Sequence, residues 1–197
     1  MMPTVSLDRA IVIVGKMESG KSTAVRAIAE ELGLKVVSFG ALVRAKAAEQ
    51  GLDDSRTTLQ DLGQRMFTSL GAGHLLQAAM EYAGVQNGDS VVFDGVRHHF
   101  VLDEIRAIGN ATVTCYLDID DRHRYERYLT KSQSDSSLTF KEFQRIDRHS
   151  IEVGVEQLAS TADVVIDAKL PLCRILHQIQ LGLKALGITN VKERGSM

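Results

Sequence analysis

A glycine-rich octapeptide near the amino terminus carries the clearest chemistry in this sequence. Residues 15–22 read GKMESGKS and fit the pattern G-x-x-x-x-G-K-[ST]. The glycines let backbone N–H groups approach an anion closely, the lysine can reach the outer oxygens of that anion, and the serine hydroxyl can bind Mg²⁺. A polyphosphate needs such converging donors, so the octapeptide predicts a phosphate-binding loop, called the P-loop below.

The segments on either side of the P-loop have the required context. Residues 10–14 (AIVIV) are an apolar, β-branched run typical of a buried strand, and residues 23–32 have apolar side chains at helical spacing. A helix that begins at the end of the loop aims its N–H groups and positive dipole end at the anion. We expect ATP to contact Gly15, Glu18, Ser19, Gly20, Lys21, Ser22 and Thr23.

An acidic residue and an arginine follow a second buried strand. Asp94 comes directly after residues 90–93 (SVVF), and Arg97 follows one short turn later. Ligands of open α/β sheets bind at the carboxyl ends of the strands. Asp94 could therefore hold Mg²⁺ together with Ser22, or accept a proton from a hydroxyl nucleophile, while Arg97 could bind a phosphate or carboxylate. The alternatives are a helix cap and a solvated cation.

Three polar residues between the second and third strands are candidates for binding a phosphoryl acceptor. Arg44 lies in a helix that follows the second strand, and Gln60 and Arg65 lie in the next helix. An arginine can hold a phosphate, and an amide can read the edge of a base. For each of them an ordinary exposed position on a helix surface is the alternative.

A basic cluster lies around a serine-rich break at residues 131–137. Arg124, Arg127 and Lys131 share one helical face, and Arg148 follows the break. Arginines that close over a migrating phosphoryl group would neutralise its developing charge, and a movable flap would exclude water. A solvated helix with local ion pairs is the alternative. The predicted catalytic residues are Lys21, Asp94, Arg124, Arg127 and Arg148, and the predicted metal ligands are Ser22 and Asp94.

Short apolar strands alternate with helices, which predicts a parallel sheet covered on both faces. We expect strands at 10–14, 35–39, 90–93, 111–117 and 163–166, helices at 59–70 and 74–83, and one long helical stretch at 139–159. A chain of 197 residues suits one domain, 1–197, of the α/β P-loop NTPase class with five parallel strands flanked by helices.

Composition limits the partners. The net charge is −2, with 24% charged residues, so no basic excess favours DNA as the acceptor and no feature favours a membrane.

Cys115 and Cys173 lie in apolar runs and are expected to be buried free thiols. No long apolar run or signal peptide is present, so we expect a cytoplasmic monomer or homodimer.

Several segments together resemble the nucleoside-monophosphate-kinase-like branch of P-loop kinases, which includes adenylate, cytidylate and dephospho-coenzyme A kinases. Residues 38–44 (SFGALVR) are similar to its acceptor-binding helix, 94–97 (DGVR) to its Asp-Gly-x-x-Arg segment, and 124–127 (RYER) to the arginine pair that opens its lid. Residues 59–63 (LQDLG) resemble deoxynucleotide-kinase relatives, including phage kinases of hydroxymethylated uracil in DNA. The resemblance runs from about residue 10 to 168.

The resemblance implies an ATP- and Mg²⁺-dependent kinase with an acceptor-binding region at about 38–85 and an arginine-bearing lid at about 122–150. The expected acceptor is a nucleotide, in the first place a (deoxy)nucleoside monophosphate. One alternative is a kinase directed at a hydroxyl group, on dephospho-coenzyme A or on a 5-hydroxymethyl pyrimidine in DNA. A P-loop ATPase switch is a further alternative.

Overall fold

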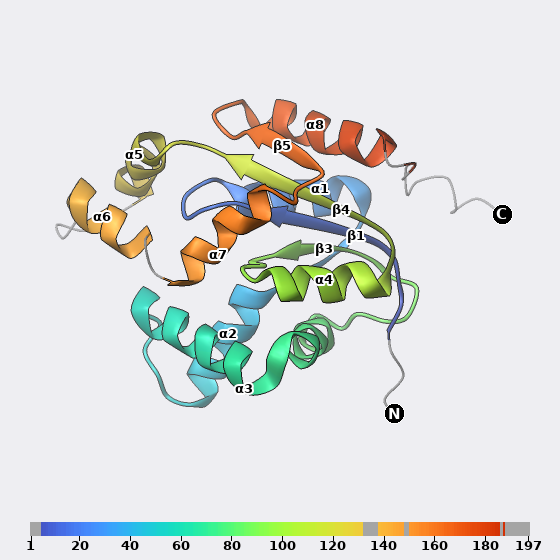
Figure 1. Ribbon diagram of the computed structural model, residues 1–197, viewed down its shortest axis with the longest axis horizontal. Coiled ribbons are helices and arrows are strands. Elements are labelled where there is room, and N and C mark those ends of the chain that lie inside the picture. Colours follow the sequence, from blue (N-terminus) through green and yellow to red (C-terminus); the bar gives the residue numbers. More distant parts are fainter. Residues whose placement is uncertain (1–4, 132–137, 148–149, 186, 188–197) are drawn as a thin grey trace.

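The computed structural model describes residues 5–131, 138–147, 150–185 and 187. Its centre is a five-stranded parallel sheet in the order β2-β3-β1-β4-β5 (Figure 1). The strands span Leu7–Val14 (β1), Lys35–Ser38 (β2), Ser90–Asp94 (β3), Gly109–Asp118 (β4) and Val164–Asp167 (β5). The predicted sheet and its five strands are therefore confirmed.

Helices cover both faces of the sheet and its carboxyl edge. They span Lys21–Leu32 (α1), Phe39–Glu49 (α2), Arg56–Tyr82 (α3), His99–Ile108 (α4), Asp121–Lys131 (α5), Phe140–Asp147 (α6), Ser150–Ala159 (α7) and Leu172–Ala185 (α8). Among the described residues, no helix is long and apolar enough to cross a membrane.

The alternation of side chains along β1 explains the layers. Ala10, Val12 and Val14 belong to a buried cluster with residues of α2, α3, α4 and α7, whereas Ile11 and Ile13 belong to a second cluster with α1 and α8. Successive side chains of a strand point to opposite faces, so the apolar part of β1, residues 10–14, must be covered on both. The central strand is thereby fixed between the two helical layers.

One helical prediction differs from the structure and another agrees with it. The expected stretch 139–159 is divided into α6 and α7, and residues 148–149 between them lie outside the described residues. The two helices expected at 59–70 and 74–83 are confirmed: α3 begins at Arg56 and consists of two helical parts that meet at a kink at Gly71, where the backbone is not helical. Gly71 has φ 75°, which glycine adopts without the steric cost that a side chain would bring.

The two cysteines differ from each other in burial. Cys115 in β4 is buried, as predicted, and burial raises the pKa of its thiol to about 12. Cys173 in α8 is exposed, so the prediction of a buried thiol there is wrong. It lies two residues before Ile175, about 200° around the helix from that buried residue.

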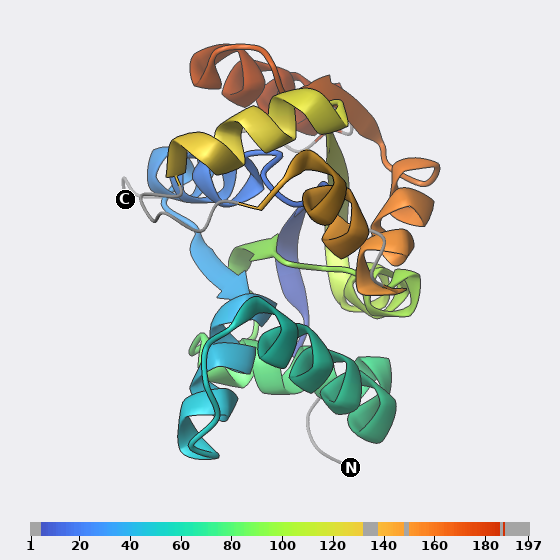
Figure 2. The same ribbon diagram turned by 90° about the vertical axis from the view of Figure 1, so that its left-hand side faces the viewer.

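Strand order places the functional edge of the sheet. The central β1 pairs with β3 on one side and β4 on the other, and Ile13 of β1 is aligned with Asp94 of β3. The connections that follow β1 and β3 lead to opposite sides of the sheet, and ligands bind at the carboxyl ends where this reversal occurs. Figure 2 views this edge, with α5 and α6 above and α2 and α3 below.

Candidate active site

The P-loop turns sharply from the buried end of β1 into α1. The amide of Ser19 donates to the carbonyl oxygen of Lys16 at 3.2 Å. Glu18 and Gly20 have positive φ angles of 57° and 93°. Left-handed residues at such a turn direct successive N–H groups into one concavity, which is a geometry that binds anions. Gly20 is also the N-cap of α1, and no side chain caps the helix there.

The lysine of the P-loop lies across its own loop. Lys21 Nζ donates to the carbonyl oxygen of Lys16 at 3.2 Å. A lysine ammonium is a compact charge on a flexible stem, so it can exchange this carbonyl for a phosphate oxygen by rotating its side chain. The structure thus places Lys21 at the mouth of the loop, where the sequence pattern predicts it.

Ser22 and Asp94 meet although 72 residues separate them. The hydroxyl of Ser22 donates to Asp94 Oδ2 at 3.0 Å. The other carboxylate oxygen, Oδ1, is buried and has no hydrogen-bond partner among the described residues. Adjacent hydroxyl and carboxylate oxygens are ligands that suit Mg²⁺. The two predicted metal ligands are therefore brought together, and the donor set fits that ion.

Close backbone packing fixes the position of Asp94. Ser38 at the end of β2 is aligned with Asp94, and its hydroxyl caps α2 by accepting from the Ala41 amide at 3.2 Å. Gly95 follows with φ 85°. A Cβ atom there would lie in van der Waals contact with the Gly40 nitrogen, at 3.5 Å, so the turn packs against the start of α2.

A pocket of about 310 Å³ adjoins this turn, between α2, α3 and the β3–α4 connection. Arg44, Gln60 and Arg97 all contribute to its lining, so three of the four predicted acceptor-binding residues are brought together. Arg65 is exposed and is not among the lining residues. Five residues correspond to about 140° of rotation on a helix, so Arg65 points away from the face that carries Gln60.

Gln60 is the most enclosed polar residue of the pocket. Its side chain is 9% exposed, and its Nε2 atom is buried without a hydrogen-bond partner among the described residues. A buried amide donor left unpaired costs about 1–3 kcal/mol. That cost is removed when a ligand in the pocket supplies an acceptor.

Sequence reasoning missed a stacked histidine in the same pocket. His98 lines the cavity, and its ring lies parallel to that of Phe67, with centroids 3.8 Å apart and planes at 6°. Burial, followed by the nearby charges of Arg97 and His99, lowers the pKa of His98 below its usual 6.5. The sequence did offer one indication of this role, because His98 directly follows the predicted acceptor-binding residue Arg97. Asp54 and Arg56, at the start of α3, also line the pocket.

The predicted lid arginines contact the P-loop itself. Arg124 is fully buried, and its Nη1 donates to the carbonyl oxygen of Met17 at 3.1 Å. Arg127 donates from Nη1 to the Ser19 carbonyl at 2.9 Å and from Nη2 to the Ala168 carbonyl at 2.6 Å. Arg148 and the serine-rich residues 132–137 lie outside the described residues. An arginine lid therefore stays a prediction.

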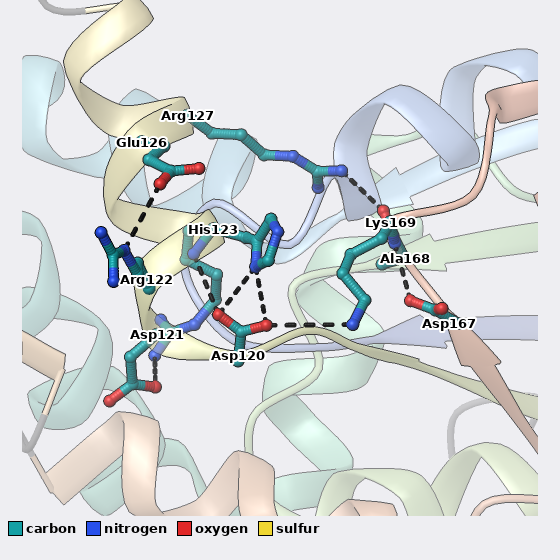
Figure 3. A network of polar contacts seen from close by, with 10 residues as sticks. Asp120, Asp121, Arg122, His123, Glu126, Arg127, Asp167, Ala168 and Lys169 are labelled. Carbon is teal, nitrogen blue, oxygen red and sulfur yellow. Dashed lines mark hydrogen bonds and ion pairs between the residues drawn. The ribbon is translucent and has the colours of Figure 1, made fainter.

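A polar network holds the first turn of α5 to the loop after β5 (Figure 3). Asp120 accepts hydrogen bonds from the backbone amide of His123 at 3.0 Å, which caps the helix. The His123 ring lies 2.7 Å from the same carboxylate, and Lys169 approaches it at 3.9 Å. The hydrogen bonds from His123 lower the pKa of Asp120 to about 2. This network caps α5, whereas the hydrogen bonds of Arg124 and Arg127 hold the helix beside the P-loop.

Comparisons with known proteins show the fold that carries this candidate site. Crystal structures of TT1252 from Thermus thermophilus (TM-score 0.65, 16% identity, 94% of this chain and 100% of that chain) and of shikimate kinase from Aquifex aeolicus (0.60, 18%, 91% and 98%) are similar. So is a gluconokinase from Sinorhizobium meliloti, with a TM-score of 0.55 and 18% identity over 92% of this chain and 94% of that chain. These likenesses establish a P-loop kinase-like fold in a single domain.

Sequence relatives and a family model assign the chain more closely. A UPF0200 protein of Saccharolobus islandicus is 30% identical over 159 residues, which cover 80% of this chain and 83% of the relative. One from Sulfurisphaera tokodaii is 29% identical over 82% and 88%. The model of an AAA domain matches residues 11–152, from β1 to α7. The chain therefore belongs to the AAA domain family of P-loop proteins and to the UPF0200 group.

Proposed function

We propose that this protein is an ATP- and Mg²⁺-dependent kinase that transfers the γ-phosphoryl group to a nucleotide-type acceptor, in the first place a (deoxy)nucleoside monophosphate. The observation that carries the proposal is the hydrogen bond between Ser22 and Asp94 at 3.0 Å, at the mouth of a P-loop and beside a separate pocket. A donor site and an acceptor site thus adjoin one pair of candidate metal ligands.

The donor side supports ATP binding with a divalent ion. Among the described residues, no group of three or more His, Cys, Asp or Glu side chains could hold a metal alone. Mg²⁺ is commonly bound through one or two protein oxygens together with substrate phosphates. Ser22 and Asp94 would supply those oxygens, and Mg²⁺, when bound, neutralises charge on the β- and γ-phosphates. Lys21 would hold the same phosphates from the other side of the loop.

The acceptor side supports an anionic substrate with a hydrogen-bonding edge. The pocket lining contains three arginines, Arg44, Arg56 and Arg97, and one carboxylate, Asp54, so positive charge prevails. The buried Gln60 amide offers both a donor and an acceptor to a base. A volume of about 310 Å³ lies at the lower end of small-molecule sites, and a base in duplex DNA would have to leave the stack to enter it.

In this mechanism the protein positions the two substrates and neutralises phosphate charge, and it forms no covalent bond with either substrate. Arg44 and Arg97 orient the acceptor, and Lys21 and the loop amides hold the γ-phosphate so that an acceptor oxygen can attack it in line. A phosphate acceptor is already anionic and attacks without a base. Asp94 then serves only the metal.

A hydroxyl-directed kinase is the second candidate, and one observation favours it. The buried Oδ1 atom of Asp94 lacks a partner among the described residues, so it has the capacity to accept a proton from an attacking hydroxyl group. Dephospho-coenzyme A and a 5-hydroxymethyl pyrimidine in DNA are the acceptors to test.

The deciding experiment incubates the protein with Mg²⁺ and ATP labelled at the γ-phosphate, together with each candidate acceptor. The panel contains ribo- and deoxynucleoside monophosphates, nucleosides, dephospho-coenzyme A and hydroxymethylated DNA. Label on a monophosphate supports the proposal, and label on a hydroxyl supports the second candidate. Loss of ATP to free phosphate with every acceptor would contradict both and indicate an ATPase switch.

Asp94→Asn separates the two candidates further. With a hydroxyl acceptor we expect turnover to be abolished while nucleotide binding persists, because the variant cannot take the proton. With a phosphate acceptor we expect residual turnover that raised Mg²⁺ concentration restores in part. Asp103→Asn, at an exposed position on α4, is the matched control.

A further inference from the structure

One face of α5 binds the outer side of the P-loop. Arg124 and Arg127 donate to the carbonyl oxygens of Met17 and Ser19, and Lys131 forms an ion pair of 2.6 Å with the Glu18 carboxylate. Residues three and seven apart lie on one helical face. This basic face, residues 124, 127 and 131, therefore meets the consecutive loop residues 17–19.

Because of peptide geometry, these contacts determine where the backbone N–H groups on the inner side of the loop point. A peptide unit is planar and trans, so the Met17 carbonyl is antiparallel to the Glu18 N–H, and the Ser19 carbonyl to the Gly20 N–H. Guanidinium groups that hold both carbonyls outward therefore turn both N–H groups the other way. In a P-loop that inner side is where backbone N–H groups surround the phosphates.

The loop conformation needs such support. Among the described residues, Glu18 is the one non-glycine with a positive φ, 57°. A backbone of this kind costs roughly 1–3 kcal/mol and persists where its surroundings determine it. Arg124 holds the peptide unit before Glu18, and Arg127 Nη1 also donates to the Glu18 carbonyl in the unit after it, at 3.5 Å. Lys131 holds the Glu18 side chain.

Arg124 is placed for this task and not for contact with a substrate. Its side chain is 0% exposed, its Nη2 donates to Asp121 at 2.6 Å, and its guanidinium lies 5.5 Å from the centre of the Phe143 ring. Phe143 is itself fully buried. Moving the guanidinium toward a phosphate would break these contacts and leave a buried carbonyl unpaired, which is costly.

We propose that Arg124 is a positioning residue that sets the conformation of the P-loop through the Met17 carbonyl, and that Arg127 does the same through Ser19. This assignment replaces the expectation that Arg124 closes over the transferring group. It rests on the proposed function only in that the loop is taken to bind a nucleotide. The effect of Arg124 on the conformation of the loop is expected in the nucleotide-free protein as well.

The test compares Arg124→Lys with Arg122→Lys, a control on the same helix whose side chain is 85% exposed. Lysine keeps the charge but loses the planar fork that spans Met17 and Asp121. In amide NMR spectra of the nucleotide-free protein we expect the Glu18 and Gly20 resonances to move in Arg124→Lys only. Calorimetry with a non-hydrolysable ATP analogue should give about tenfold weaker binding in that variant.

A second variant covers a failure of Arg124→Lys to fold. Asp121→Asn removes the charge that anchors the guanidinium and leaves Arg124 in place, so smaller shifts of the same two resonances are expected. Lower thermal stability with unchanged loop resonances and affinity would overturn the proposal. So would a loss of kcat with unchanged affinity, because that result would assign Arg124 to the transferring group.

The two proposals fail in distinguishable ways. If the wild-type protein binds no nucleotide, the proposed function is wrong. The resonance shifts of Arg124→Lys would then still support Arg124 as the residue that shapes the loop.

Discussion

The two sides of the candidate site differ in which of their polar groups are already hydrogen-bonded. On the donor side, the outward carbonyls of Met17 and Ser19 are bonded to α5, and the Ser22 hydroxyl is bonded to Asp94. On the acceptor side, the Gln60 amide nitrogen is buried without a partner in the described part of the chain. The backbone of the donor loop is thus held in place before any ligand arrives, whereas Asp94 Oδ1 beside the loop and the Gln60 amide in the acceptor pocket keep hydrogen-bonding capacity for ligands.

This difference leads to a general expectation. Changes on the donor side should impair nucleotide binding or transfer with every acceptor. Changes on the acceptor side should raise KM for the acceptor and leave nucleotide affinity intact, because the pocket residues contact only one substrate. The substitutions below test that division.

Lys21→Met should have the largest effect. It removes the cation that would hold the transferring phosphate, so we expect kcat to fall by about a hundred- to a thousandfold with any acceptor. Lys184→Met, on the exposed side of α8, is the control and should leave turnover unchanged. Full activity of Lys21→Met in the γ-phosphate transfer assay would place the chemistry elsewhere.

Gly15→Ala tests how tightly the donor loop is packed. A Cβ atom at Gly15 would lie 2.7 Å from Ser19 Oγ and 3.0 Å from the Leu117 carbonyl oxygen, so the loop must shift. We expect weaker binding of the ATP analogue and a loss of about 1–3 kcal/mol in the free energy of unfolding.

The matched change on the acceptor side is Gly63→Ala. Its Cβ atom would make an ordinary contact of 3.6 Å with Val43 Cγ2. Calorimetry with the ATP analogue should resemble the wild type, and urea unfolding should show equal or higher stability, because alanine replaces glycine within a helix. Equal effects of the two alanines would contradict the view that the donor side is the more closely packed one.

Arg44→Ala and Arg65→Ala test whether both predicted arginines bind the acceptor or only the one that lines the pocket. Arg44 lines the pocket, whereas Arg65 is exposed outside it. We expect Arg44→Ala to raise KM for the acceptor by about tenfold, the loss of one charge-assisted hydrogen bond, with ATP affinity unchanged. Arg65→Ala should change KM much less. Steady-state kinetics with varied acceptor decides, and the reverse order would move the acceptor site along α3.

The smallest expected effect is a pH dependence from His98. Burial lowers the pKa of His98 in the folded protein below 6.5, so between that lowered value and 6.5 the unfolded chain binds more protons. The free energy of unfolding should therefore fall as pH falls below 6.5. His98→Phe keeps a ring to stack on Phe67 and removes the proton site.

Urea unfolding at a series of pH values measures this contribution. The wild type should lose stability below pH 6.5 more steeply than His98→Phe. Parallel curves would show that His98 is protonated equally in the folded and unfolded states.

Local patterns predicted the strand and helix on either side of the P-loop. Residues 15–22 are consecutive, so their types and spacing define the loop almost by themselves, and β1 and α1 confirm the expected flanks. Asp94 was recognisable because it ends an apolar strand. Its contact with Ser22 follows from parallel pairing, which brings carboxyl ends to one edge of the sheet.

The acceptor side and α5 were less predictable. Gln60 and Arg65 are close in sequence, but the rotation of α3 buries the first and exposes the second. The spacing of Arg124, Arg127 and Lys131 indicated a shared face, yet not what that face contacts. The P-loop carbonyls lie more than 100 residues away in the chain.

The amino-acid sequence by itself determined the P-loop pattern and the alternation of strands and helices. Those features depend on neighbours within a few turns of chain. Only the tertiary structure decided the strand order, the lining of the pocket and the attachment of α5 to the loop. Each of these depends on how helices rotate and dock against distant segments, and that is set by the burial of apolar faces across the whole molecule.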